Sequence, residues 1–150
     1  MIRIFLTLLT TLILGFSAAS YAHKDATGIV KERMDLFKKS QQDIKALYAS
    51  IRSDELEDIR TNAAALAQWG AVMPDYFPEG SGGGVSEAFA EIWKNFDGFK
   101  DAAKTFELAT LSVVAAVDQG DKEAIISAAK SVRLQIFRLA HPRGARASLN

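Results

Sequence analysis

Apolar residues recur at steps of three and four along most of the chain, which is the spacing of one helical face. The first repeat comprises Val30, Met34, Phe37, Gln41, Ile44, Tyr48 and Ile51, with Gln41 as its polar member. The second comprises Leu56, Ile59, Ala63, Leu66, Trp69 and Met73, and Pro74 follows it directly. We expect one helix from each repeat, with Ser53 as the N-cap of the second and Pro74 at its end.

Two further repeats occupy the second half of the chain. One comprises Phe99, Ala103, Phe106, Thr110, Val113 and Val117, and the other Ile125, Ala129, Val132, Ile136 and Leu139. We expect a break at Asp97 or Gly98 before the third helix, Asp121 as the cap of the fourth, and Pro142 as its stop. Strand-like alternation of useful length is absent from the sequence. The pattern therefore predicts an all-α fold, an antiparallel up-down four-helix bundle.

The segment between the second and third repeats has the composition of a loop. Residues 74–86 contain two of the three prolines and four of the ten glycines of the chain. Long loops inside compact domains are often functional. We expect the loop to end at Ser86, as the N-cap of a short helical piece that includes Ile92 and Trp93.

The N-terminus has the features of an export signal. Arg3 precedes an apolar stretch over residues 4–16, and Ser20-Tyr21-Ala22 offers small residues at the positions that a signal peptidase reads. The stretch is shorter than the roughly 20 residues that span a bilayer, which favours a cleaved signal over a membrane anchor. We expect a signal peptide at 1–22 and one domain at 23–150, with no membrane attachment after cleavage.

The composition of the chain excludes several classes of binding site and activity. The 18 basic residues balance the 18 acidic ones, so there is no charge excess for nucleic acid. The chain contains no cysteine, which excludes disulfides, iron–sulfur clusters and zinc sites of the cysteine type. No acid pair or Ser-His-Asp set has a spacing that indicates hydrolysis, and we expect no enzymatic activity.

Several motifs together resemble the cytochrome c′ family. They are Phe77-Pro78-Glu79-Gly80-Ser81-Gly82, Glu91-Ile92-Trp93, Gly98-Phe99 and the pair Arg33-Met34. Family members are periplasmic four-helix bundles with one haem attached through Cys-x-x-Cys-His on the fourth helix. In this chain Phe137-Arg138-Leu139-Ala140-His141 stands at that place, so the histidine is kept and both cysteines are replaced. Covalent haem c is therefore excluded.

The resemblance implies a set of haem-binding residues. His141 would be the proximal iron ligand, as imidazole commonly is. Arg33-Met34 is placed as in the soluble b-type bundle cytochrome, which binds haem through an early Met and a late His. Met34 would then be the second ligand and Arg33 a neighbour of the cofactor, unless Phe37 leaves the iron five-coordinate. Leu134 and Phe137 precede His141 on its own helical face and would form a wall of the pocket.

Two functions stay open at this point. In the first, the chain binds haem b reversibly and serves in electron transfer or small-gas binding, with a redox partner protein. In the second, Phe137 fills the interior and the chain is a haem-free binding or accessory module. The family resemblance also implies the periplasm and a possible homodimer through the first two helices, for which Leu36 and Leu47 would be exposed.

Overall fold

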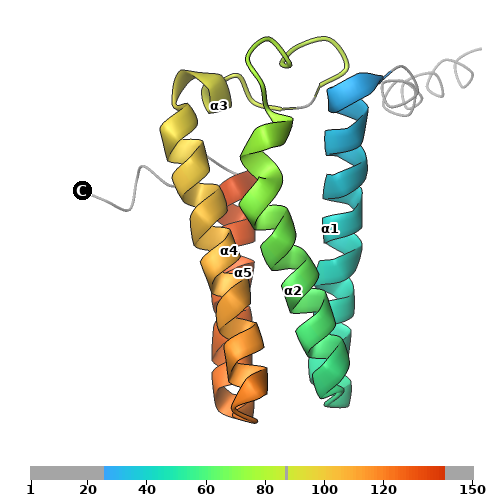
Figure 1. The fold of residues 1–150 in the computed structure, drawn as a ribbon, viewed down its shortest axis with the longest axis vertical. Coiled ribbons are helices and arrows are strands. Elements are labelled where there is room, and N and C mark those ends of the chain that lie inside the picture. Colours follow the sequence, from blue (N-terminus) through green and yellow to red (C-terminus); the bar gives the residue numbers. More distant parts are fainter. Residues whose placement is uncertain (1–25, 87, 141–150) are drawn as a thin grey trace, which may run out of the picture.

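The computed structural model describes residues 26–86 and 88–140, and these form a bundle of four long helices (Figure 1). The long helices are α1 (Gly28–Ser53), α2 (Leu56–Val72), α4 (Phe96–Asp118) and α5 (Lys122–Ala140). Two short elements lie at the loop end of the bundle, the 3-10 helix η1 (Met73–Tyr76) and α3 (Glu91–Lys94). No strand occurs in this part of the chain, and the predicted all-α four-helix bundle is confirmed.

The four helices do not pack on one another equally. α2 packs along both α1 and α4, and α4 packs along α5, whereas α1 and α5 touch only sparsely. One of these contacts is a hydrogen bond of 2.8 Å from the Tyr48 hydroxyl to the carbonyl oxygen of Ala129. The bundle is therefore closed on three sides and loosely packed between its first and last helices.

The unequal packing decides which residues of α1 are buried. Every position of the predicted α1 repeat is half-buried except Gln41, which is exposed. The fully buried positions of α1 are instead Arg33, Ser40, Leu47 and Ser50. The reason is that α1 packs mainly on α2, so its apolar repeat borders the sparse contact with α5.

The core explains why one expectation about dimerisation is wrong. Leu47 is completely buried, and Leu36 packs against the same core. Leu47 is therefore not the exposed apolar contact that we expected on the first helix, and Leu36 is only half-exposed. The largest buried side chains are Leu47, Ile59, Leu66, Met73, Val113, Val132 and Thr110.

Two of the predicted helix boundaries are wrong. Ser53 is the last residue of α1 and not the cap of α2, because Asp54 turns the chain with φ at 61° and α2 begins at Leu56. The break before the third long helix falls at Asn95, ahead of Asp97 and Gly98. The side-chain oxygen of Asn95 accepts the Gly98 N–H at 3.2 Å, which caps α4.

The last helix begins as the sequence predicts. The carboxylate of Asp121 accepts the N–H of Ala124 at 2.9 Å, so Asp121 is the N-cap of α5. An acidic side chain is favourable there because it meets the unpaired N–H groups and the positive end of the helix dipole.

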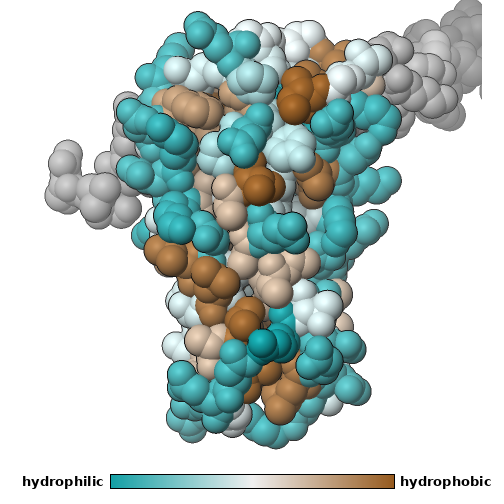
Figure 2. All heavy atoms as spheres, in the orientation of Figure 1, coloured by the Kyte–Doolittle hydropathy of each residue, from teal (hydrophilic) through white to brown (hydrophobic). Residues whose placement is uncertain are grey.

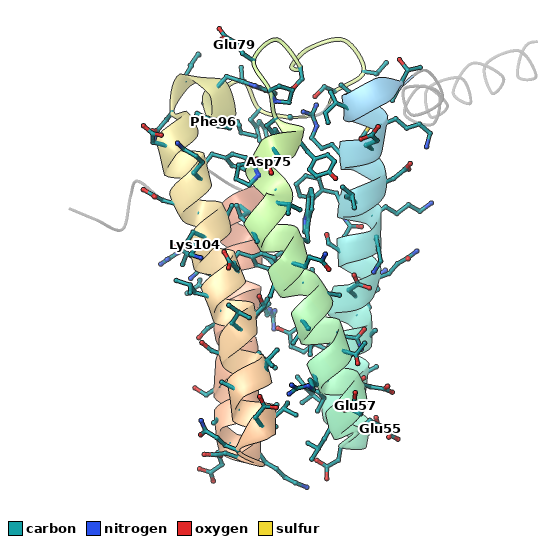
Figure 3. The ribbon with its side chains drawn as sticks, in the orientation of Figure 1. Glu55, Glu57, Asp75, Glu79, Phe96 and Lys104 are labelled. Carbon is teal, nitrogen blue, oxygen red and sulfur yellow. The ribbon has the colours of Figure 1, made fainter. Side chains whose placement is uncertain are left out.

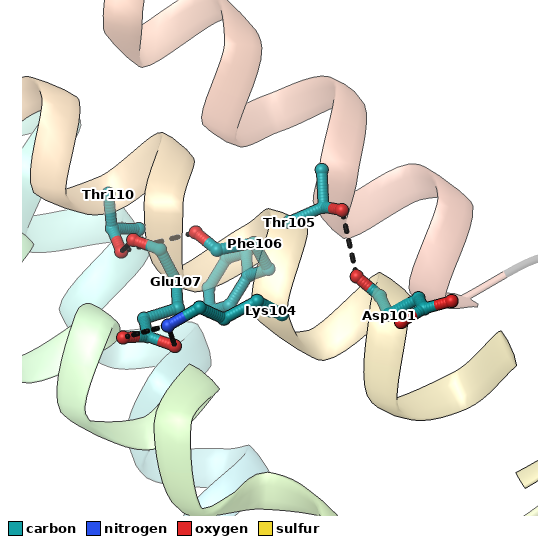
Figure 4. A network of polar contacts seen from close by, with 6 residues as sticks. All are labelled: Asp101, Lys104, Thr105, Phe106, Glu107 and Thr110. Carbon is teal, nitrogen blue, oxygen red and sulfur yellow. Dashed lines mark hydrogen bonds and ion pairs between the residues drawn. The ribbon is translucent and has the colours of Figure 1, made fainter. Parts of the chain in front are cut away.

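α2 approaches the backbone of α4 closely at Gly70. A Cβ atom at this position would lie 3.0 Å from the backbone nitrogen of Glu107 and 3.0 Å from a ring carbon of Phe106. In the same stretch of α4, the buried Thr110 hydroxyl donates to the Glu107 carbonyl at 2.7 Å (Figure 4). A residue without a side chain is thus what lets α2 lie against the backbone of α4.

The predicted signal peptide at 1–22 lies outside the described residues. None of the described helices combines the length and the apolar character that crossing a membrane requires.

Candidate functional site

A cavity of about 890 Å³ lies where α1 and α5 part at the loop end of the bundle. Met34 and Phe37 line it from α1, and Leu139 lines it from α5. Phe77 and Phe89 contribute from the connecting loop. The volume falls in the range of roughly 300–1,000 Å³ that is usual for small-molecule and cofactor sites.

The aromatic wall of the cavity is held by other rings of the core. The Phe37 ring meets Trp69 edge-on, with centroids 5.2 Å apart, and meets Phe77 edge-on at 6.2 Å. Phe77 also meets Phe99 at 4.7 Å. Edge-to-face pairs at these distances are favourable geometries, so Phe37 has a defined position.

Arg33 lies beside the cavity and is only 3% exposed. Its Nη1 donates to the carbonyl oxygen of Tyr76 and to the Ser81 hydroxyl, both at 3.0 Å. Its Nη2 donates to the Ser81 carbonyl at 2.9 Å and to the Ser86 hydroxyl at 2.8 Å. The guanidinium carbon also lies 4.5 Å from the centre of the Phe77 ring, a cation–π contact.

Among the described residues, no carboxylate balances the charge of Arg33. The four oxygen atoms that accept its hydrogen bonds are neutral, and it forms no ion pair in this part of the chain. Burial lowers the pKa of the guanidinium from its ordinary value, since desolvation disfavours the charged form. A buried cation with neutral partners only is a favourable place for an anionic group.

The motif Phe77-Pro78-Glu79-Gly80-Ser81-Gly82 forms the loop that covers this end of the bundle. The indole N–H of Trp93 donates to the carbonyl oxygens of Phe77 and Pro78, at 3.1 and 2.9 Å. A Cβ on Gly82 would lie 2.8 Å from the Trp93 ring, so glycine allows the loop to lie flat on the indole. Glu79 projects from the outer edge of the loop, away from the helices (Figure 3).

Ser86 has a different role from the predicted one. It does not cap α3, which begins at Glu91 after Ala90. Its hydroxyl oxygen accepts from Arg33 and also from the Ala88 N–H at 3.3 Å. Sequence reasoning missed this role because the partner of Ser86 lies on a helix more than fifty residues earlier.

The structure brings some of the predicted cofactor residues together and separates others. Arg33, Met34 and Phe37 lie around one cavity. Leu134 and Phe137 do not line it, and they are 49% and 59% exposed. His141 lies outside the described residues.

Leu134 and Phe137 are separated from the cavity because they point to a different side of α5 from its inward-facing residues. Val132, Ile136 and Leu139 recur at helical spacing and face inward, with Val132 completely buried. Leu134 lies two residues from Val132 and from Ile136, and Phe137 lies two residues from Leu139, so each is about 200° around the helix from those positions. Leu139 was expected on the inner face, but nothing in the sequence alone indicated that it would line a cavity.

Comparison with known proteins identifies the family. The family model for Cytochrome C′ matches residues 28–135. A cytochrome c′ of Rhodospirillum rubrum is 34% identical over 104 residues, which make up 67% of this chain and 71% of that protein. The chain belongs to the cytochrome c′ family. This membership supports a function of the haem-binding kind, in electron transfer or gas binding.

The match to cytochrome c′ ends before the segment where the haem-attachment motif would stand. It stops at residue 135, ahead of Phe137, and the chain has no cysteine with which to form a thioether bond. Within the described ranges, no group of three His, Cys, Asp or Glu side chains is placed to hold a metal ion. Any haem in this cytochrome c′ relative would have to be held by the cavity itself.

The residues around the cavity fit such a group. Its walls include Phe37, Phe77 and Leu139, and burial of apolar surface contributes about 25 cal/mol per Å². Met34 supplies a thioether, a known haem ligand. Arg33 supplies a cation that has no acidic partner in the part of the chain that the structure describes. The cavity thus offers apolar walls, a candidate ligand and a site for a carboxylate.

Proposed function

We propose that this protein binds haem b without covalent attachment, in the cavity between α1 and the end of α5. When bound, haem supplies an iron centre that exchanges electrons or binds small gas molecules. The observation that carries the proposal is the cavity of about 890 Å³ that holds Met34 and Phe37 in a chain of the cytochrome c′ family.

Each residue has a proposed part. Met34 would offer its thioether sulfur to the iron, and His141 its imidazole. If Met34 does not bind the iron, Phe37 would restrict access to the metal. Arg33 would donate to a carboxylate at the edge of the haem in place of one of its neutral acceptors, because charge-assisted hydrogen bonds are about twice as strong as neutral ones.

We propose that the protein acts in the periplasm. Support comes from the apolar segment near the N-terminus and from Ser20-Tyr21-Ala22, which suit export and cleavage. N-terminal sequencing of the exported protein should give His23 as the first residue, and retention of residue 1 would contradict this assignment.

The second candidate is a haem-free accessory module. Phe137 is exposed and does not fill the interior, so that expectation from the sequence is wrong. What favours the module is that Leu134 and Phe137 do not form the two expected walls, together with the loss of both attachment cysteines. In this case the cavity would be used for another ligand or not at all.

A haemin titration followed by absorption distinguishes the two candidates. For the chain from residue 23, we expect a sharp Soret band that saturates at a single equivalent. The band should shift in His141→Ala and in Met34→Leu if these side chains ligate the iron. A spectrum equal to that of haemin in buffer would reject haem binding and leave the accessory module.

A variant that fills the cavity locates the binding site. Leu139→Trp places a larger side chain in the cavity and should abolish the Soret change. Leu108→Trp is the matched control, because Leu108 is 52% exposed on α4, away from the cavity. Equal loss in both variants would show that haemin adheres to the surface instead.

A further inference from the structure

The side of the bundle on which α1 and α5 lie next to each other carries an unusual set of basic residues. Lys38, Lys45 and Arg52 recur every seven residues along α1, so they share one strip of its surface. All three are exposed. Lys38 lines the cavity together with Leu139 of α5, which places this strip on the side of α5.

A matching strip runs along α5. Arg133 follows Ala129 by one helical turn, and Ala129 is the residue that the Tyr48 hydroxyl contacts from α1. Arg133 also acts on the pKa of Tyr48 through its charge, which confirms that it faces α1. Lys130 lies on the same strip of α5, three residues before Arg133.

Among the described residues, six other basic side chains form ion pairs with carboxylates, whereas Lys94 and Arg138 form none. Lys104 pairs with Glu107, Lys100 with Asp97, and Arg60 with Asp118. Across the described parts of the chain, no carboxylate forms an ion pair with Lys38, Lys45, Arg52, Lys130 or Arg133. Positions 38, 41, 45, 48 and 52 of α1 and 126, 130, 133 and 137 of α5 hold no acidic residue, and the acidic Glu123 stands on the α5 strip only in the first turn of the helix.

Apolar side chains accompany the charges. Ile126 and Phe137 lie one turn from Lys130 and Arg133 along the same strip of α5, and they are 47% and 59% exposed. Aromatic residues and arginine are enriched in protein interfaces relative to the rest of the surface. An exposed phenylalanine beside cations does not improve the solvation of the surface. Its presence therefore favours a contact surface.

We propose that this side of the bundle, hereafter the α1–α5 face, is a docking surface for an acidic partner protein. Five cations of this face attract the partner by charge complementarity: Lys38, Lys45, Arg52, Lys130 and Arg133, none of which forms an ion pair with another described residue. Phe137 and Ile126 supply the apolar contact. The cations disfavour pairing of this face with that of a second copy, because like charges would then meet. The proposal does not depend on haem.

The test uses a synthetic helical peptide with Glu and Leu on one face, and a copy with Lys in place of Glu. Binding to the haem-free chain from residue 23 is measured by calorimetry. We expect the Glu peptide to bind, with an affinity that falls when salt rises from about 20 to about 200 mM. The Lys peptide should not bind, and equal binding of both peptides would overturn the proposal.

Two double variants with the same change in net charge locate the site. Lys45→Glu/Arg133→Glu should weaken binding at least about tenfold, since it reverses two charges of the face. Lys94→Glu/Lys104→Glu reverses exposed charges elsewhere and should change the affinity less than about twofold. All four positions are exposed, so both variants should keep the helical circular dichroism. Equal loss in the two variants would refute a localised surface.

Two further measurements address the apolar contact and the class of partner. Phe137→Ser should weaken peptide binding about fivefold at both salt concentrations, because it removes an aromatic anchor without changing charge. Vesicles of phosphatidylglycerol and phosphatidylcholine provide the alternative anionic surface. Tighter binding to these vesicles than to the peptide, with the same loss in Lys45→Glu/Arg133→Glu, would assign the face to a lipid surface and overturn the proposal.

Discussion

Arg33 shows how much one residue can depend on the fold around it. Its guanidinium joins α1 to three separate points of the connecting chain, at Tyr76, Ser81 and Ser86. The planar group with fixed donors suits this task, because it can hold acceptors on two sides at once. Arg33 therefore fixes the loop over the cavity in addition to offering a cation to a ligand.

We expect Arg33→Met to destabilise the protein by about 2–3 kcal/mol, because the hydrogen bonds of a charged donor are lost and buried acceptors remain. Arg33→Lys should recover little of this, since an ammonium cannot reach the same acceptors. Urea unfolding measures the difference. The control is Arg52→Met, at an exposed position without an ion pair, which should stay within about 0.5 kcal/mol.

Tyr48 links α1 and α5 and makes the stability depend on pH. Burial raises the pKa of its hydroxyl, and the charge of Arg133 lowers it to a smaller extent. A raised pKa in the folded state means that the hydroxyl stabilises the fold at pH values below its unfolded pKa, about 10. This stabilisation is lost as the pH rises through the pKa of the folded state.

Tyr48→Phe should therefore be less stable than the natural chain by about 1 kcal/mol at pH 8, where the bond to Ala129 is intact. The difference should shrink or reverse at pH 11. Urea unfolding of both proteins at the two pH values measures it. A difference that does not change with pH would mean that the Tyr48 hydroxyl ionises as freely in the folded state as in the unfolded one.

At the scale of elements, periodicity identified every long helix but not which face would be buried most. The α5 repeat through Val132 and Leu139 is the inward face, as predicted. The α1 repeat that includes Met34 and Phe37 is only half-buried, because α1 packs on α2 through a different set of residues, which includes Leu47. The periodicity of a sequence shows that one face of a helix is apolar. The packing of the neighbouring helix determines how much of that face is buried.

The contact between α2 and α4 gives a prediction at this scale. Gly70→Ala would gain about 1 kcal/mol of helix propensity in isolation. We nevertheless expect a net loss of about 1–3 kcal/mol, because the new methyl group meets the backbone of Glu107 and the helices must move apart. Thermal or urea unfolding measures the sign of the change.

The matched control is Ala64→Gly in the same helix, at an exposed position. It should lose only about 1 kcal/mol of propensity. A stabilised Gly70→Ala protein would mean that α2 and α4 have room to separate without cost.

On the scale of the whole molecule, the cavity adjoins one end of the core and shares Phe77 with it. The core joins Leu47, Ile59 and Leu66 with Val113 and Val132, while the cavity lies at the loop end, bordered by Met34 and Leu139. Figure 2 shows the polar side chains that cover much of the visible surface, broken by an apolar band along α4. The chain should therefore fold without a cofactor.

We expect haemin to stabilise this fold by mass action. At a free concentration of about 100 times its dissociation constant, the gain should be about 2.7 kcal/mol. Urea unfolding with and without haemin measures it. Leu139→Trp should show no gain, and a gain equal to that of the natural chain would place the haem outside the cavity.

The sequence by itself determined the fold class, the helices and the family, because apolar spacing and cap residues such as Asp121 act within a few residues of the chain. It also excluded covalent haem, since that requires cysteine. Only the tertiary structure decided that Arg33 meets Ser86, that Phe137 faces outward, and that Leu139 borders the same cavity as Met34. These relations depend on the sparse contact of α1 with α5 and on the phase of the last helix. The contact between α1 and α5 and the orientation of α5 both result from the packing of whole helices. This packing involves residues that are far apart in the sequence, so local sequence patterns do not predict it.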